Sequence, residues 1–287
     1  MRADLSKLDA LVIGNGFLAN YLVPLLAYGR TLLVSRTGRP RGQNQHSAHA
    51  HRCLAIDITK QKDTDRLAHE LVGFCGDVFF LLPPSTLADR APASALGPLF
   101  GTLQQVNVRR VIVTSSTGVY RENTDAPVSA ASGHLADTPR ARRLLGIEQA
   151  WLASGFAVHI ARLAGLYGRG RIVGRGHIER GDTIAARADG FLNLVHGADA
   201  ARAVLATAEL AAPPLLSLIS DGEPVRRRDY YYHLAQLLGA QTPRFSRAQD
   251  AAPRSRRCDP NASWQALGLT PNYASYQAGL GELVAEL

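Results

Sequence analysis

The stretch that decides the fold lies near the start of the chain and reads Leu11-Val12-Ile13-Gly14-Asn15-Gly16-Phe17-Leu18-Ala19. The apolar run predicts a buried strand, and Asn20 to Tyr28 predicts a helix after the glycine turn. In this context a G-x-G-x-x-G/A pattern binds a dinucleotide, because the first glycine permits the turn, the second lets the backbone approach a pyrophosphate, and the third small residue lets helix and strand pack closely. The alternative is a tight turn without a ligand. The predicted cofactor-binding residues of the turn are Gly14, Asn15, Gly16, Phe17, Leu18 and Ala19.

Apolar runs alternate with helical patterns along the first part of the chain. Alternation of this kind predicts an α/β fold with a doubly wound parallel sheet. From about residue 165 the alternation loosens and glycines become frequent, which predicts a nucleotide-binding core over 1–165 and a small C-terminal substrate lobe over 166–287, interleaved with the remaining strands and helices of the core. The predicted strands are 11–13, 31–34, 53–56, 78–82, 110–113 and 157–161, and the predicted helices are 64–73, 138–154 and 198–210.

The chain of 287 residues is 46% hydrophobic and carries a net charge of +8. A basic excess favours anionic partners, such as a dinucleotide phosphate or an acidic small substrate. Nucleic acid is not expected, because no dense Lys/Arg stripe with interleaved aromatic residues is present. We expect no membrane partner, since no apolar run reaches spanning length. A homodimer is left open.

Three scattered cysteines, Cys53, Cys75 and Cys258, indicate a reducing compartment. Together with the lack of a signal-peptide pattern at the N-terminus, they predict a cytoplasmic protein. The histidines in the polar segment 37–52 lack carboxylate or thiol support, so no metal site is expected.

Several motifs further along the chain line up in order with the glycine turn. Asp57 follows the third predicted strand, and Ser115-Ser116-Thr117-Gly118-Val119-Tyr120 follows the fifth. The segments Arg162–Gly168 and Asn193–Ala201 come next. In this order they resemble the landmarks of the NAD(P)-dependent epimerase/dehydratase family, the extended short-chain dehydrogenases/reductases, over nearly the whole chain.

The resemblance implies a Rossmann-like fold and an NAD(P)-dependent oxidoreductase or epimerase/dehydratase-like activity. It implies that Asp57 contacts adenine and that Ser116 is the hydroxyl that polarises the substrate. Leu82 ends the fourth predicted strand and Pro83 follows it, where the chain of such proteins passes the nicotinamide half of the cofactor. By resemblance, His196 braces the backbone.

The chain departs from this family at its catalytic pair, Tyr-x-x-x-Lys. Counting back from Glu148, which fits the family's glutamate, puts Leu144 in the place of the lysine and Arg140 in the place of the tyrosine. The three lysines of the chain all lie in its first quarter. Arg140 stays protonated and is no general acid, but it can clamp a carboxylate or phosphate. The alternative is an exposed arginine with no ligand.

The end of the second predicted strand indicates which cofactor is bound. NAD sites usually place an acid there to accept from the ribose 2′-hydroxyl. Here Val34 is followed by Ser35, Arg36 and Thr37, which predicts NADP, with NAD as the alternative cofactor. Arg39 or Arg41 can add to the positive field. A plain basic loop is the competing interpretation.

By elimination, Ser116 and Tyr120 are the predicted catalytic residues, and Ser115, Arg140 and Tyr167 the predicted substrate-binding residues. Without a neighbouring lysine, Tyr120 is a better acid than base, which favours reduction. The leading hypothesis is an NADPH-dependent reductase of a small polar substrate. The alternative is a non-catalytic NADP(H)-binding sensor or regulatory protein.

Overall fold

The computed structural model describes residues 8–26, 31–39, 52–87, 90–121, 127–133, 135–246 and 256–287. The chain divides into two compact units. The first comprises Met1–Ser116, Thr138–Arg162 and Ala201–Leu216, and the second comprises Thr117–Asp137, Leu163–Ala200 and Ser217–Leu287. The second unit therefore includes Thr117–Asp137, a segment that precedes the boundary predicted at residue 165.

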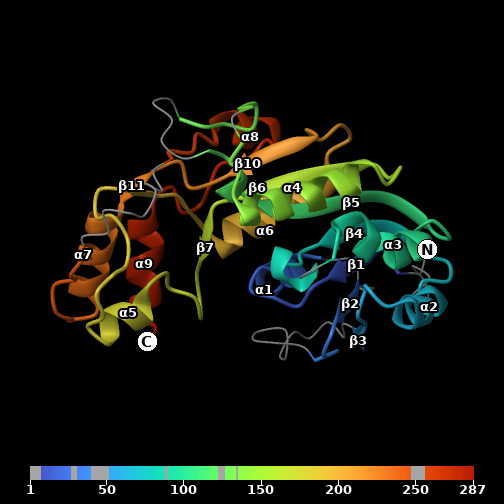
Figure 1. Ribbon diagram of the computed structural model, residues 1–287, viewed down its shortest axis with the longest axis horizontal. Helices are drawn as coiled ribbons and strands as arrows, with labels where there is room; N and C mark the ends of the chain where they lie inside the picture. Colours follow the sequence, from blue (N-terminus) through green and yellow to red (C-terminus); the bar gives the residue numbers. More distant parts are fainter. Residues whose placement is uncertain are drawn as a thin grey trace, which may run out of the picture. The chain divides into compact units, whose positions relative to one another are not determined.

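A seven-stranded sheet with the order β10-β6-β5-β4-β1-β2-β3 runs through the molecule (Figure 1). Strand β1 pairs in parallel with β2 on one side and β4 on the other, and the pairs β2/β3 and β4/β5 are parallel too. The predicted α/β fold with a Rossmann-like parallel sheet is therefore confirmed. The strands are β1 (Ala10–Ile13), β2 (Thr31–Ser35), β3 (Arg52–Ala55), β4 (Cys75–Phe80), β5 (Asn107–Ser116), β6 (Val158–Leu163) and β10 (Leu216–Ile219).

The position of β1 matters for ligand binding. The chain runs from β1 to β2 and β3 on one side and returns to β4 and β5 on the other, so the strand order reverses at β1. Open parallel sheets bind ligands beyond the carboxyl ends of their strands at such a reversal. The glycine turn that follows Ile13 lies at this point.

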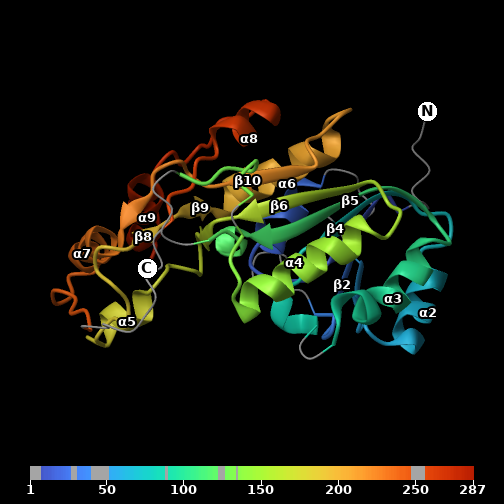
Figure 2. The same ribbon diagram turned by 45° about the horizontal axis from the view of Figure 1, so that its top comes forward.

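Helices cover the sheet, with α2, α3 and α4 along one face and α6 behind the other (Figure 2). Helix α4 begins as the sequence predicts: Pro139 is its first residue, and the Thr138 side chain accepts a hydrogen bond from the Ala141 N–H at 3.1 Å. Among the described residues, no helix has both the length and the apolar character that crossing a membrane requires. The helices are α1 (Ala19–Leu22), α2 (Gln61–Glu70), α3 (Pro92–Leu103), α4 (Pro139–Leu152) and α6 (Gly197–Glu209).

Two helices differ from the sequence prediction. Helix α3 was not predicted, since its two prolines and two glycines disguise the pattern, but buried Leu96 and Leu99 stabilise it against the sheet. The helix predicted from Asn20 ends early, because α1 gives way at Val23 to a 3-10 turn that contains Pro24. Residues 27–30 lie outside the described part of the chain.

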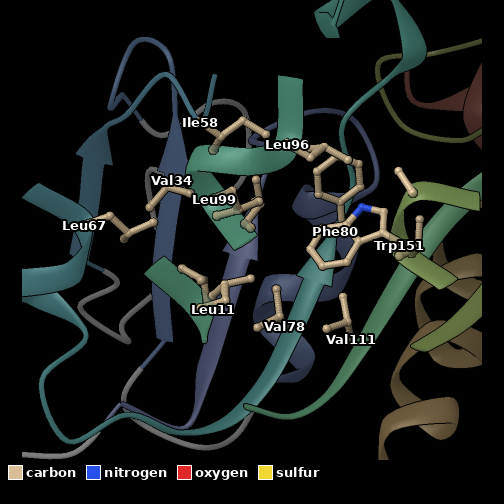
Figure 3. Packing of buried hydrophobic residues seen from close by; sticks show 14 of the residues in the cluster. Leu11, Val34, Ile58, Leu67, Val78, Phe80, Leu96, Leu99, Val111 and Trp151 are labelled. Atoms are coloured by element: carbon tan, nitrogen blue, oxygen red, sulfur yellow. The ribbon is translucent and has the colours of Figure 1, made fainter. Parts of the chain in front are cut away.

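The core of the first unit lies between the sheet and the covering helices (Figure 3). Phe80 of β4 packs edge-on against Trp151 of α4, with ring centroids 5.2 Å apart, and Phe100 of α3 meets the same indole at 4.8 Å. These aromatic contacts join two helices to the centre of the sheet. The aliphatic part of the core includes Leu11, Val34, Leu67, Val78, Leu96, Leu99 and Val111, none of them more than 1% exposed.

The second unit has a core rich in tyrosine. Its strands form two short pairs, β7 (Gly165–Tyr167) with β9 (Leu194–His196) and β8 (Phe191–Leu192) with β11 (Val225–Arg226). Its helices are α5 (Arg175–Glu179), α7 (Arg227–Leu237), α8 (Asn261–Ala266) and α9 (Tyr276–Ala285). The rings of Tyr230 and Tyr276 lie 5.3 Å apart in a cluster with Leu234 and Leu280.

The second unit also buries a carboxyl group at Asp221, which follows β10 and is 5% exposed. Its Oδ1 accepts from the Glu223 N–H at 3.1 Å, while its buried Oδ2 has no hydrogen-bond partner among the described residues. Burial raises the pKa of Asp221 to about 8; the charges of Glu223 and Asp199 add to the rise, and the hydrogen bond from Glu223 opposes it. Asp221 is therefore protonated in the folded protein at neutral pH.

This shift predicts a pH-dependent stability. Unfolded Asp221 has a pKa of 3.8, so between that pH and about 8 the folded protein holds a proton that the unfolded chain has released. The free energy of unfolding therefore falls as pH rises through this window. In Asp221→Asn, which resembles the protonated acid, this fall is absent. Denaturant titrations from about pH 5 to about pH 9 should show wild type losing at least about 1.4 kcal/mol relative to the variant. Parallel curves for the two proteins would contradict the assignment.

Candidate functional site

A pocket of about 220 Å³ lies at the carboxyl ends of β1 and β2 in the first unit. It brings together seven of the predicted cofactor-binding residues: Asn15, Gly16, Ser35, Arg36, Asp57, Leu82 and Pro83. The remaining lining residues are Ile13, Val34, Thr37, Ile56, Ile58 and Thr86. Of these, Ile58 and Thr86 were not singled out from the sequence, since an isolated aliphatic residue and an isolated threonine carry no signal of their own.

The glycine turn fits a dinucleotide pyrophosphate. Gly14 has φ 114°, and its N–H donates to the Val34 carbonyl at 2.9 Å. A Cβ at Gly14 would lie 3.0 Å from Leu82 Cδ2 and close to the Leu81 carbonyl, so a side chain there would collide with the chain after β4. A Cβ at Gly16 would meet no heavy atom within 4 Å, which leaves its backbone open to a ligand.

The rest of the turn supports the fold beneath the pocket. Ala19 is fully buried and Leu18 is 6% exposed, so both pack inward. Phe17 is half-buried and its ring lies 5.2 Å from that of Tyr21. A small residue at position 19 is what close packing of helix on strand requires.

Asp57 lies where adenine is expected, after β3. Its Oδ1 accepts from the Thr59 hydroxyl at 2.8 Å and from the Thr59 N–H at 3.1 Å, and Lys60 Nζ lies 3.7 Å from Oδ2. Partial burial raises the pKa of Asp57, but the bonds from Thr59 and the charge of Lys60 outweigh it, so the pKa is lowered overall. Asp57 is therefore an ionised acceptor on the pocket wall.

The end of β5 is held by a buried ion pair in the first unit. Glu148 of α4 and Arg162 of β6 are 4% and 6% exposed. Arg162 Nε and Nη2 donate to the two carboxylate oxygens of Glu148 at 3.1 and 2.7 Å. The hydroxyl of Ser115 donates to the same carboxylate, so the predicted substrate-binding residue Ser115 is engaged in this structural contact.

The positions of the missing catalytic pair are visible in α4. Leu144 is 4% exposed, so an apolar side chain packs inward where the family's lysine belongs. Arg140 is exposed in the first turn of the helix. No described side chain restores a Tyr-x-x-x-Lys arrangement on this helix.

The predicted hydroxyl residues differ in exposure. Ser116, the last residue of β5, is half-buried in the first unit. In the second unit Tyr120 is fully buried, with its carbonyl accepting from Arg256. Tyr167 is also fully buried; its hydroxyl donates to the Ser275 carbonyl at 3.4 Å, and burial raises its pKa further above the ordinary value. This burial favours a packing role for Tyr167.

His196 behaves as the resemblance implies. Its Nδ1 accepts from the Ala198 N–H at 3.3 Å, its ring centroid lies 3.9 Å from that of Tyr273, and burial lowers its pKa. It braces the start of α6. The candidate residue Arg41 lies outside the described residues, as do the histidines of the polar segment, His46, His49 and His51. Within the described ranges, no three side chains of His, Cys, Asp or Glu gather as metal ligands.

Relatives with known names resemble this chain in sequence and in structure. Protein YeeZ of Escherichia coli (strain K12) is 31% identical over 207 residues, which are 69% of this chain and 68% of YeeZ. No family model matches the chain.

Among solved structures, MoeE5 in complex with UDP-glucose and NAD superimposes with a TM-score of 0.79 at 25% identity, covering 96% of this chain and 97% of MoeE5. The UDP-glucose 4-epimerase of Thermotoga maritima, solved with UDP-glucose, gives a TM-score of 0.80 at 18% identity and covers 97% of this chain and 98% of the epimerase. The UDP-glucose 4-epimerase of Thermus thermophilus in complex with NAD gives 0.79 at 16% identity, with 97% and 98% covered.

The parallel sheet, its glycine turn and the pocket beside that turn are those of an α/β protein of the Rossmann type. The chain belongs to the NAD-dependent epimerase/dehydratase family, as its motifs predicted. Within that family it departs at the catalytic pair, where Arg140 and Leu144 stand.

The Glu148–Arg162 pair should be important for stability. Arg162→Met leaves a buried carboxylate without its cation, which costs about 3–5 kcal/mol. The double variant Glu148→Leu/Arg162→Met removes both charges and should be more stable than Arg162→Met. The control is Arg175→Met, which breaks the exposed pair of Arg175 with Glu179 and should cost less than about 1 kcal/mol. Denaturant unfolding measures all three; equal losses in Arg162→Met and Arg175→Met would refute the prediction.

Proposed function

We propose that this protein is an NADPH-dependent reductase of a small polar substrate. The observation that carries the choice of cofactor is the end of β2, where Ser35 and exposed Arg36 line the pocket and no acid follows Val34. A guanidinium pairs with a 2′-phosphate, whereas a carboxylate there would repel it. The compared structures that hold a dinucleotide hold NAD, so the preference for NADP is specific to this proposal.

Each group in the pocket has a defined task in this proposal. The open backbone at Gly16 would face the pyrophosphate, Asp57 would accept from the adenine end, and Leu82 and Pro83 would form the wall toward the nicotinamide. When bound, NADPH supplies a hydride. The half-buried hydroxyl of Ser116 at the end of β5 would polarise the substrate carbonyl.

The missing tyrosine and lysine favour reduction over alcohol oxidation or epimerisation. Those reactions need a base, and proton transfer by a positioned group contributes about 10²- to 10⁴-fold in rate. Reduction needs no base; the proton that the product oxygen takes up after hydride arrives would come from water, relayed by the Ser116 hydroxyl. Since two of the compared proteins hold UDP-glucose, sugar nucleotides are the substrates to screen first. Arg140 would meet the phosphates of such an anion.

Cofactor preference tests the first part of the proposal. Wild type should bind NADPH more tightly than NADH, and Arg36→Ala should lose about 10-fold or more of its NADPH affinity, since a hydrogen bond to a charged group is worth about 1.5–3 kcal/mol. The affinity of Arg36→Ala for NADH should equal that of wild type. Arg66→Ala, an exposed arginine on α2, is the control. Fluorescence titration measures these affinities. If wild type binds NADH more tightly than NADPH, the assignment of NADP is wrong.

Turnover tests the second part. With a substrate in hand, Ser116→Ala should lower kcat by about 10²-fold, the lower range for a lost acid–base contact. Tyr120→Phe should lower kcat less, because the tyrosine side chain is fully buried in the second unit. Steady-state kinetics at saturating NADPH measure both. An unchanged kcat in Ser116→Ala would remove this serine from the mechanism.

A second candidate function rests on Leu144. An apolar side chain packed inward in the place of the catalytic lysine suits a protein that binds NADP(H) without turning over a substrate. Such a protein would sense the cofactor or regulate a partner. Tight NADPH binding with no oxidation across a panel of carbonyl substrates would favour it over the reductase.

A further inference from the structure

Asn15 makes a contact that the glycine-turn pattern does not call for. Its side chain is 7% exposed and lies between Gly14 and Gly16 in the turn. The amide Nδ2 donates to the carbonyl of Arg39, 24 residues further along the chain. Because a carbonyl can only accept, the nitrogen of the amide must face it. Asn15 thus ties the turn after β1 to the loop after β2.

The loop is held at two further points. The Gly38 N–H donates to Ser35 Oγ at 3.2 Å. Gly38 has φ 61°, and a Cβ there would lie 2.6 Å from the backbone nitrogen of Ala55, so the loop presses against β3. Arg36 and Thr37 lie between these contacts, exposed, on the wall of the pocket.

The other end of the Asn15 amide indicates that the contact with Arg39 is not a by-product of packing. Its Oδ1 is buried and has no hydrogen-bond partner among the described residues. A buried acceptor without a donor costs stability, which a smaller residue at this position would avoid. The hydrogen bond from Nδ2 to the Arg39 carbonyl, which holds the loop in place, offsets this cost.

We propose that Asn15 is a positioning residue that determines cofactor specificity: by holding the carbonyl of Arg39, it fixes the loop from Ser35 to Arg39 so that Arg36 meets an adenosine 2′-phosphate. The inference rests on the proposed binding of NADP. Asn15 acts through Arg36 and does not touch the phosphate. Its loss should therefore weaken only ligands that carry a 2′-phosphate.

A double-mutant cycle with two small probes tests this inference. The probes are adenosine 2′,5′-bisphosphate and ADP, and the variants are Asn15→Ala, Arg36→Ala and the double variant. Asn15→Ala should weaken the bisphosphate about 5- to 10-fold, the equivalent of one ordinary hydrogen bond, and leave ADP unchanged. The double variant should bind the bisphosphate as weakly as Arg36→Ala alone, because two residues that act through one contact are not additive. Isothermal titration measures these affinities.

A second readout needs no ligand. Hydrogen exchange at the Gly38 N–H should be faster in Asn15→Ala than in wild type, since the loop has lost one of its attachments. Asn107→Ala is the matched control, because this exposed asparagine at the start of β5 donates to Cys75 Sγ at the start of β4 and does not line the pocket. Its exchange at Gly38 and both affinities should equal those of wild type.

The outcomes separate the inference from the proposed function. Equal weakening of both probes in Asn15→Ala, additive losses in the double variant, or unchanged exchange at Gly38 would overturn the inference while leaving NADP binding intact. Wild-type protein that binds neither probe would overturn the proposed function and the inference together. Wild type that binds both probes equally, with no change in the variants, would overturn the choice of NADP and the role of Asn15.

Discussion

The first unit depends on one buried ion pair. Arg162 on β6 and Glu148 on α4 meet through two hydrogen bonds, and Ser115 on β5 donates to the same carboxylate. Two charges buried this deeply are tolerated only where their hydrogen bonds are satisfied, so a shift of α4 against the two strands would leave a buried charge unpaired. Apolar contacts such as Phe80 on Trp151 supply the driving force for packing, but they tolerate small shifts. The polar contact opposes such shifts, because they would break its hydrogen bonds.

The same arrangement explains how the chain keeps the family fold without the family's catalytic pair. The glutamate that normally follows the catalytic lysine is present as Glu148, and its place in the fold is structural. Leu144, one turn earlier, packs inward and adds apolar contact to the helix. An apolar residue therefore packs well in the place of the lysine, so the packing of this helix does not require the family's catalytic residue.

The pocket beside the glycine turn is built differently, from loops that follow parallel strands. Four segments, after β1, β2, β3 and β4, converge because the carboxyl ends of parallel strands meet at one edge of the sheet. Each turn is held by contacts close in the sequence, such as Ser35 with Gly38 and Asp57 with Thr59. The contact of Asn15 with Arg39 joins the turn after β1 to the loop after β2, so these two walls of the pocket are linked.

The sequence by itself determined the features that depend on neighbours within a few residues. The strand, glycine turn and small Ala19, the cap at Thr138 and the absence of an acid after Val34 were all readable, and with them the α/β fold and most of the pocket. Helix α3 was not predicted from the sequence, because prolines and glycines have a low helix propensity. The packing of its leucines on the sheet nevertheless stabilises the segment as a helix.

Only the tertiary structure decided which of the singled-out side chains stay accessible. Tyr120 and Tyr167 carry the hydroxyls that a sequence pattern suggests for chemistry, yet both are fully buried, while Ser116 keeps part of its surface. The bond from Asn15 to Arg39 and the protonated Asp221 were equally invisible, because they arise between segments far apart in the chain or from burial itself. Periodicity, caps and turns act over a few residues, but solvent exposure and long-range hydrogen bonds exist only once the chain has packed.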